Sequence, residues 1–134
     1  MPNYKQNFMR YMDSQGIKYT DNNEYSVRVA YTGDNLKTIA FYVYFDKEGK
    51  NLVQLRCWEV ANFKGKEAKG IIICNDMNAK YRWAKFYLDK DADILVECDA
   101  YINEDCGPEC LSLVRRLVNI TDEAYPNFAK ALWS

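Results

Sequence analysis

Residues 38–57, TIAFYVYFDKEGKNLVQLRC, carry the alternation that decides the fold. One set of alternate side chains is apolar and predicts a core-facing side: Ile39, Phe41, Val43 and Phe45. Tyr42 and Tyr44 lie between them and point the other way. Period two with aromatic and β-branched residues is typical of strands, and DKEGK is short enough for a hairpin turn. The stretch therefore predicts two antiparallel strands with one apolar side that faces the core.

The remaining elements follow outward from this hairpin. The same alternation predicts strands in YSVRVAY (25–31), WAKFYLD (83–89) and DILVECDAYI (93–102). Apolar spacings of three and four predict helices over 4–15, over 66–81 and from residue 107 onward. The order α-β-β-β-α-β-β-α predicts an α+β layered domain built on an antiparallel sheet.

Helix ends and faces can also be predicted. Asn3 with Gln6 forms an amide version of a capping box, and Gly16 is a natural stop for the first helix. The second helix has one recurring stripe, made of Ala68, Ile71, Ile72, Asn75 and Ala79. Pro126 predicts either a kink in the last helix or a separate final turn.

Composition excludes several classes of function. With 134 residues, 49% of them hydrophobic, residues 1–134 are expected to form one domain. The 18 basic and 19 acidic residues leave a net charge of −1, which argues against nucleic acid or anionic lipid as a partner. No apolar stretch is long enough for a bilayer, and MPNYKQNFMRYMDSQG does not resemble a signal peptide. We therefore expect a cytoplasmic protein.

The chain contains no histidine, which removes the commonest general base and most zinc sites. No Gly-rich phosphate loop is present, so we expect no cofactor and no metal. The five cysteines include no CxxC pair and are expected to be buried, inert thiols. Cys106 and Cys110, four residues apart, leave a redox pair as an alternative.

An acidic triplet, Asp89, Asp91 and Asp93, resembles the start of a calcium loop. An EF-hand would need glycine at the sixth position and glutamate at the twelfth, where this chain has Ile94 and Ala100. We therefore interpret the triplet as a hairpin turn in which an aspartate accepts backbone N–H groups. A weak exposed cation site is the alternative.

The strongest candidate binding surface is the sheet face opposite the core. If the strands pair in order, five side chains project from it together: Arg28, Tyr42, Tyr44, Arg56 and Trp58. Tryptophan, tyrosine and arginine are the residues that dominate binding hot spots. The alternative is that a helix or a second copy covers this face, and a homodimer satisfies both interpretations.

Two further sets are candidates on helices. Asn75 and Asn78 share one helical face, where they either bond backbone groups and lock the helix to the sheet or line a peptide groove. Arg115 and Arg116, with Asp122 and Glu123, form either a solvated charged side or a site for phosphate or an acidic partner.

The segment CNDMNAKYRWAKFYLDKDADILVECD resembles the signature of the YbjN family of bacterial sensory transduction regulators. LVQLRCWEV and LVRRLVNITDEAYPNF are similar to the family's preceding strand and last helix, so the resemblance covers roughly residues 25–130. Ala92 departs from the family, which usually has glycine in this turn. The resemblance implies a type III secretion chaperone-like fold, with helices packed on one face of a curved antiparallel sheet. It implies no catalytic residues, and it suggests protein or peptide binding.

Two functions are therefore considered. The first is a non-enzymatic regulatory or chaperone-like domain, a homodimer that holds protein segments through a sheet face or edge. The second is a small-ligand sensor or enzyme with a carboxylate-lined pocket made of Glu97 and Asp99 with Lys85. Because Glu97 and Asp99 alternate with core positions, we expect both to face solvent.

Overall fold

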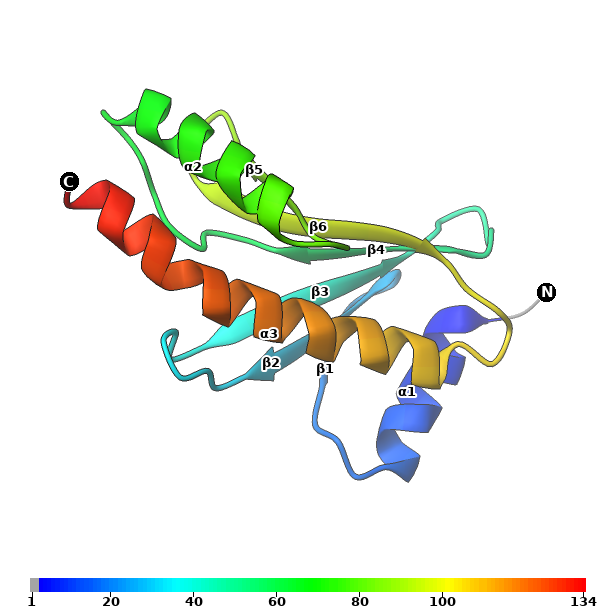
Figure 1. Ribbon diagram of the computed structural model, residues 1–134. Coiled ribbons are helices and arrows are strands. Elements are labelled where there is room, and N and C mark those ends of the chain that lie inside the picture. The colour runs from blue at the N-terminus through cyan, green and yellow to red at the C-terminus, as the bar shows by residue number, and fades with distance from the viewer. Residues whose placement is uncertain (1–2) are drawn as a thin grey trace.

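The computed structural model of the protein describes residues 3–134 (Figure 1). The described chain forms three helices and six strands. In order these are α1 (Tyr4–Ser14), β1 (Thr20–Asn23), β2 (Ser26–Tyr31), β3 (Ile39–Phe45), β4 (Leu52–Cys57), α2 (Glu67–Lys80), β5 (Lys85–Leu88), β6 (Ile94–Tyr101) and α3 (Gly107–Leu132). No helix among the described residues has the length and apolarity needed to cross a membrane.

The six strands form one antiparallel sheet in the order β1-β2-β3-β4-β6-β5. The predicted α+β class and the predicted elements are confirmed, with one addition. The sequence interpretation missed β1, whose residues TDNN are all polar and exposed and therefore give no alternation signal. The observed order is α-β-β-β-β-α-β-β-α.

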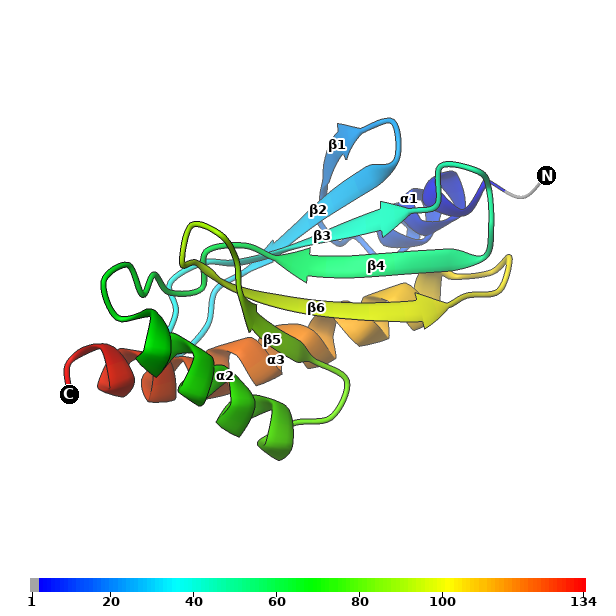
Figure 2. The same cartoon turned by 90° about the horizontal axis from the view of Figure 1, so that it is seen from above.

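All three helices pack on one face of the sheet (Figures 1 and 2). Alternate residues of the central strands point into this layer, as the burial of Val43 and Leu55 shows. They meet the fully buried Phe8 of α1 and Leu117 and Phe128 of α3 in a single apolar cluster. Burying one such side chain contributes about 1.5–3 kcal/mol.

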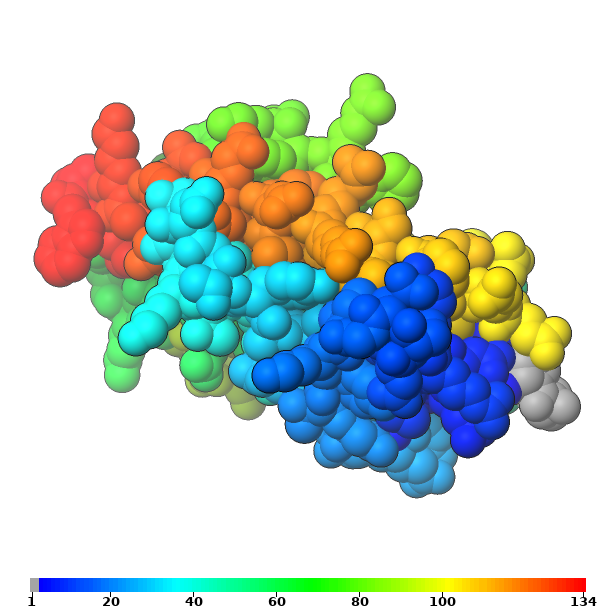
Figure 3. Space-filling view, turned by 90° about the horizontal axis from the view of Figure 1, so that it is seen from below, coloured from blue at the N-terminus to red at the C-terminus, as the bar shows by residue number. Residues whose placement is uncertain are grey.

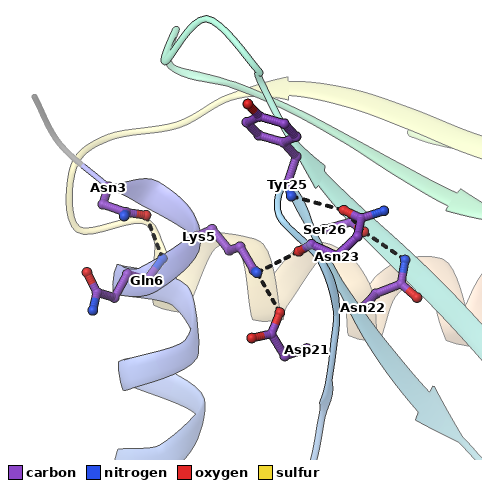
Figure 4. Close-up of polar contacts among 8 residues, drawn as sticks. All are labelled: Asn3, Lys5, Gln6, Asp21, Asn22, Asn23, Tyr25 and Ser26. Atoms are coloured by element: carbon purple, nitrogen blue, oxygen red, sulfur yellow. Dashed lines mark hydrogen bonds and ion pairs between the residues drawn. The ribbon is translucent and has the colours of Figure 1, made fainter.

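Helix α1 begins and ends as predicted. Asn3 Oδ1 accepts a hydrogen bond of 3.0 Å from the Gln6 N–H, and Gly16 adopts φ +67° beyond the last turn. Figure 4 shows that Lys5 reaches from this helix to β1, where its ammonium lies 2.5 Å from Asp21 Oδ1 and 2.6 Å from the Asn23 carbonyl oxygen. The helix therefore holds the polar edge strand in place.

Helix α2 is present, but its stripe of apolar residues faces outward. Its buried residues are Gly70, Cys74 and Met77, whereas Ile71 and Ile72 are 60% and 62% exposed. A Cβ at Gly70 would lie 3.0 Å from side-chain atoms of Phe63 and Leu88, so a larger residue would push these side chains aside. The spacing of three and four residues therefore predicted the helix, but Ile71 and Ile72 of this stripe lie on its exposed side.

Helix α3 continues through Pro126 without a separate final turn. Proline has no N–H, so the carbonyl of Asp122, four residues earlier, loses its helical donor. The Asn35 side chain replaces this donor with a hydrogen bond of 3.1 Å to the Asp122 carbonyl oxygen. In Figure 3 the loop that contains Asn35, in cyan, lies directly against the orange helix.

The two acidic hairpins are turns, as predicted. Asp46 Oδ2 accepts the N–H groups of Glu48 and Lys50, each at 3.0 Å. Asp89 Oδ1 accepts those of Asp91 and Asp93, at 2.8 and 3.0 Å. The first carboxylate of the supposed calcium loop, that of Asp89, is therefore used within its own turn, and Asp93 Oδ1 accepts a hydrogen bond of 2.7 Å from the Asn62 side chain.

Candidate binding surface on the sheet

The sheet face opposite the helices is uncovered by any described helix (Figure 2). The strand register aligns one row of side chains across five strands: Arg28, Tyr42, Arg56, Glu97 and Lys85. Tyr44 lies in the next row, stacked on Tyr42 with ring centroids 6.2 Å apart. Of the five residues predicted for this face, Arg28, Tyr42, Tyr44 and Arg56 therefore share it. We call this surface, with Trp58 at its end, the open face.

Trp58 lies one residue beyond β4, which ends at Cys57. Its side chain remains at the border of the open face, because the Arg56 guanidinium carbon lies 4.8 Å from its ring centroid. The same guanidinium lies 5.9 Å from the Tyr44 ring. Such cation–π contacts contribute about 0.5–1 kcal/mol each at exposed sites. Trp58 is 41% exposed, so its ring is held in place but remains available.

Glu97 fixes the arginine from the other side. Arg56 Nε lies 2.6 Å from Glu97 Oε1, Lys85 Nζ lies 3.4 Å from Oε2, and the Tyr87 hydroxyl donates a hydrogen bond of 2.6 Å. The Arg56 N–H direction is not aligned for a hydrogen bond, so this contact is an ion pair. Burial, followed by the hydrogen bond to Glu97, raises the pKa of Tyr87 to about 12.

This cluster corrects the expectation that Glu97 faces solvent. Glu97 does point away from the core, yet it is only 3% exposed. Long side chains on the two neighbouring strands, Arg56 and Lys85, converge on it and cover it. A buried carboxylate needs such partners to remain charged.

Two hollows lie on the open face, one on each side of this row. The first has a volume of about 470 Å³ and is lined by Leu36, Thr38, Ala40, Tyr42, Trp58 and Glu59, among others. It lies beside the cross-strand pair of Ala30 and Ala40, whose methyl groups fill little space. The second, of about 410 Å³, is lined by Tyr44, Lys47, Leu52, Gln54 and Asp99, with Asp46 at its border.

The predicted asparagines lie elsewhere, on α2. Both polar groups of the Asn78 side chain bond the backbone of Phe86 in β5: Oδ1 accepts its N–H at 2.7 Å, and Nδ2 donates to its carbonyl at 2.9 Å. Asn78 thus bonds the edge strand as another strand would. Asn75 is exposed on the same helix. The structure does not bring either residue to the open face.

The charged side of α3 divides into two parts. Arg116 lies over the ring of Trp83, 5.6 Å from its centroid, and Tyr81 donates to Glu123 at 3.1 Å. Asp122 instead accepts the N–H groups of Asp34, Asn35 and Leu36, each at 2.9 Å. These donors, first that of Leu36, hold the pKa of Asp122 below its usual value.

All five cysteines are free and buried. Burial raises the pKa of the Cys57 thiol to about 12 and that of Cys74 to about 11, so both are protonated and unreactive at neutral pH. Cys106 Sγ lies 3.3 Å from the carbonyl oxygen of Tyr4, so this thiol contacts α1 at the start of α3.

The chain belongs to the YbjN family, described as "Putative bacterial sensory transduction regulator", whose sequence profile matches residues 6–126. Among solved structures it is similar to the Yersinia pestis type III secretion chaperone SycH, crystallised in complex with a stable fragment of YscM2. The match has 17% sequence identity and a TM-score of 0.57, and it covers 89% of this chain and 97% of that chain. The predicted chaperone-like fold is confirmed. No curated protein matches the chain in sequence.

Proposed function

We propose that the chain is a non-enzymatic, chaperone-like regulatory domain of the bacterial cytoplasm that binds segments of other proteins on its open face. The observation that carries the proposal is the uncovered row of arginine and tyrosine side chains, held in place by Glu97 and bordered by Trp58. Preorganised aromatic and arginine side chains lose little conformational entropy when a partner binds. The family and the fold, which is that of a chaperone bound to a protein fragment, support this role.

The face is a better binding surface than the sheet edges. An edge binds a peptide through unpaired backbone groups, and both edge strands have only four residues. Asn78 occupies the N–H and the carbonyl of Phe86 in β5, and Lys5 binds the Asn23 carbonyl in β1. The proposed partner therefore lies on the open face of the sheet instead of extending the sheet at an edge.

The alternative of a carboxylate-lined pocket has less support. Glu97 is enclosed by Arg56, Lys85 and Tyr87, while Asp99 is exposed at the second hollow. The two carboxylates therefore do not line a common pocket with convergent polar groups, which a small-ligand site requires.

We also propose a homodimer formed through α2. Ile71 and Ile72 place two large exposed side chains on one uncharged stripe. A two-fold interface brings a surface against its own copy, and an uncharged stripe does this without placing like charges together. Ile72→Glu is expected to convert the dimer to a monomer in sedimentation equilibrium, whereas Ser112→Glu, at an exposed site on α3, leaves the dimer intact. A wild-type chain that sediments as a monomer at micromolar concentration contradicts this proposal.

The binding function is tested by capturing partners from the cytosol of the source bacterium and reconstituting each one with the purified chain. Trp58→Ala is expected to raise the Kd of the partner about tenfold, because it removes an exposed aromatic anchor and its contact with Arg56. Trp133→Ala is the matched control: this tryptophan is 87% exposed and follows α3 at the far end of the chain. Equal affinity of both variants, or recovery of only a small molecule, argues against the proposal.

A further inference from the structure

The arrangement of charge along the open face specifies the kind of segment that it can bind. Three successive positions of β3 on this face, Ala40, Tyr42 and Tyr44, correspond to the first hollow, the arginine row and the second hollow. Neighbouring positions on one face are two residues apart, about 6.8 Å along the strand. An extended ligand has the same repeat, so its side chains at i, i+2 and i+4 match the three positions.

The centre of the face suits a carboxylate. Arg28 and Arg56 are the cross-strand neighbours of Tyr42, one on each side. Glu97 pairs with Arg56 from the neighbouring strand, whereas Arg28 takes part in none of the ion pairs found within residues 3–134. A carboxylate placed between the two arginines, beside the Tyr42 hydroxyl, would therefore meet two guanidinium groups and a phenol O–H donor.

Both hollows have a lining of net negative charge. Glu59 is the charged residue that lines the first hollow, and Asp46 and Asp99 outnumber Lys47 in the lining of the second. These carboxylates disfavour an acidic side chain at either end of the ligand. The apolar surfaces of Leu36 and Trp58 in the first hollow, and of Leu52 and Tyr44 in the second, favour large apolar side chains.

We propose that the open face binds an extended protein segment with large apolar side chains at i and i+4 and a carboxylate at i+2. This inference rests on the proposed function and names the chemistry of its partner. The segment lies along β3 and β4, with the carboxylate between Arg28 and Arg56 and one apolar side chain in each hollow.

The test uses fluorescein-labelled seven-residue peptides and fluorescence anisotropy with the intact chain. The motif peptide is Ser-Leu-Ser-Glu-Ser-Leu-Ser, and two controls replace Glu with Gln or exchange it with the following Ser. We expect the motif peptide to bind at least fivefold more tightly than either control. Arg28→Gln should abolish this preference, and Ala40→Met, which fills the first hollow, should weaken binding of the motif peptide. Arg115→Gln removes an exposed arginine on α3 and is the matched control. It should change neither the preference for the motif peptide nor the affinity for it.

Equal binding of the three peptides overturns the inference, as does a preference that survives Arg28→Gln. Sedimentation of the same variants tests whether a second copy of the chain covers the open face instead. A dimer that Arg28→Gln dissociates would show that it does.

The proposed binding function and the proposed peptide motif can be disproved independently. If captured partners need Trp58 but the peptides show no preference, the motif is wrong and the binding function stands. If the motif peptide binds selectively but no protein partner is recovered, the proposed function fails.

Discussion

Replacing Glu97 with alanine is expected to lower the free energy of unfolding by about 2–3 kcal/mol. The substitution removes the carboxylate that neutralises Arg56 and accepts the Tyr87 hydroxyl, both of which contact it at 2.6 Å. Arg56 would remain largely covered without its counter-ion, which is why breaking one side of a buried pair is costly. Lys85 is 63% exposed and can be solvated, which keeps the loss below the upper end for fully buried pairs.

Urea denaturation monitored by circular dichroism measures this loss. Asp99→Ala is the matched control, because Asp99 lies on the same face and strand but is exposed, and we expect its effect to stay within about 0.5 kcal/mol. The double variant Arg56→Met with Glu97→Leu should recover most of the stability, since apolar replacements of a buried pair are often neutral. A loss below 1 kcal/mol for Glu97→Ala would show that the cluster does not hold the arginine.

Asp122→Ala is expected to lower the free energy of unfolding by about 2 kcal/mol, because three backbone N–H groups lose a charged acceptor. The loop before β3 would detach from α3 while the rest of the core remains packed. Hydrogen exchange should therefore become faster at Asp34, Asn35 and Leu36. Asp76→Ala, at an exposed helical aspartate on α2, should cause a change within about 0.5 kcal/mol.

The same carboxylate predicts a pH dependence. Since its folded-state pKa lies below the usual value, the charged form stabilises the fold above the unfolded-state pKa of about 3.9. This contribution is lost as the pH falls from about 4 through the lower folded-state pKa. Stability curves of wild type and Asp122→Asn should therefore converge in acid and separate toward neutral pH. Parallel curves between pH 2 and 6 would contradict the assigned role.

Alternation and helical spacing predicted most of the fold because core-facing residues repeat with the period of their element. The buried Phe41 and Val43 of β3 and Leu117 of α3 lie where these periods place them. The strand β1 could not be predicted, because a polar edge strand held by Lys5 has no apolar face. In α2 the pattern misled, because glycine and sulfur-containing residues form the buried side and isoleucine is exposed.

The candidate site was predictable only in part. The register of the hairpin places Tyr42, Tyr44 and Arg56 on one face, which follows from period two alone. Burial of Glu97 depends on partners from two other strands, and the role of Asp122 depends on a loop more than eighty residues earlier. The periodicity of apolar residues within one element carries no information about contacts with residues far away in the sequence. The one available signal was Pro126, which frees the carbonyl of residue 122.

Asn78 and Lys5 bond backbone groups of the two edge strands of the sheet, β5 and β1. Edge strands with unpaired backbone N–H and C=O groups allow identical chains to pair edge to edge into fibrils. Short, charged or covered edge strands prevent this. Here each edge strand has four residues, and a side chain from a helix is hydrogen-bonded to the backbone of each. Edge-to-edge pairing of identical chains is therefore disfavoured, while the middle of the sheet stays accessible.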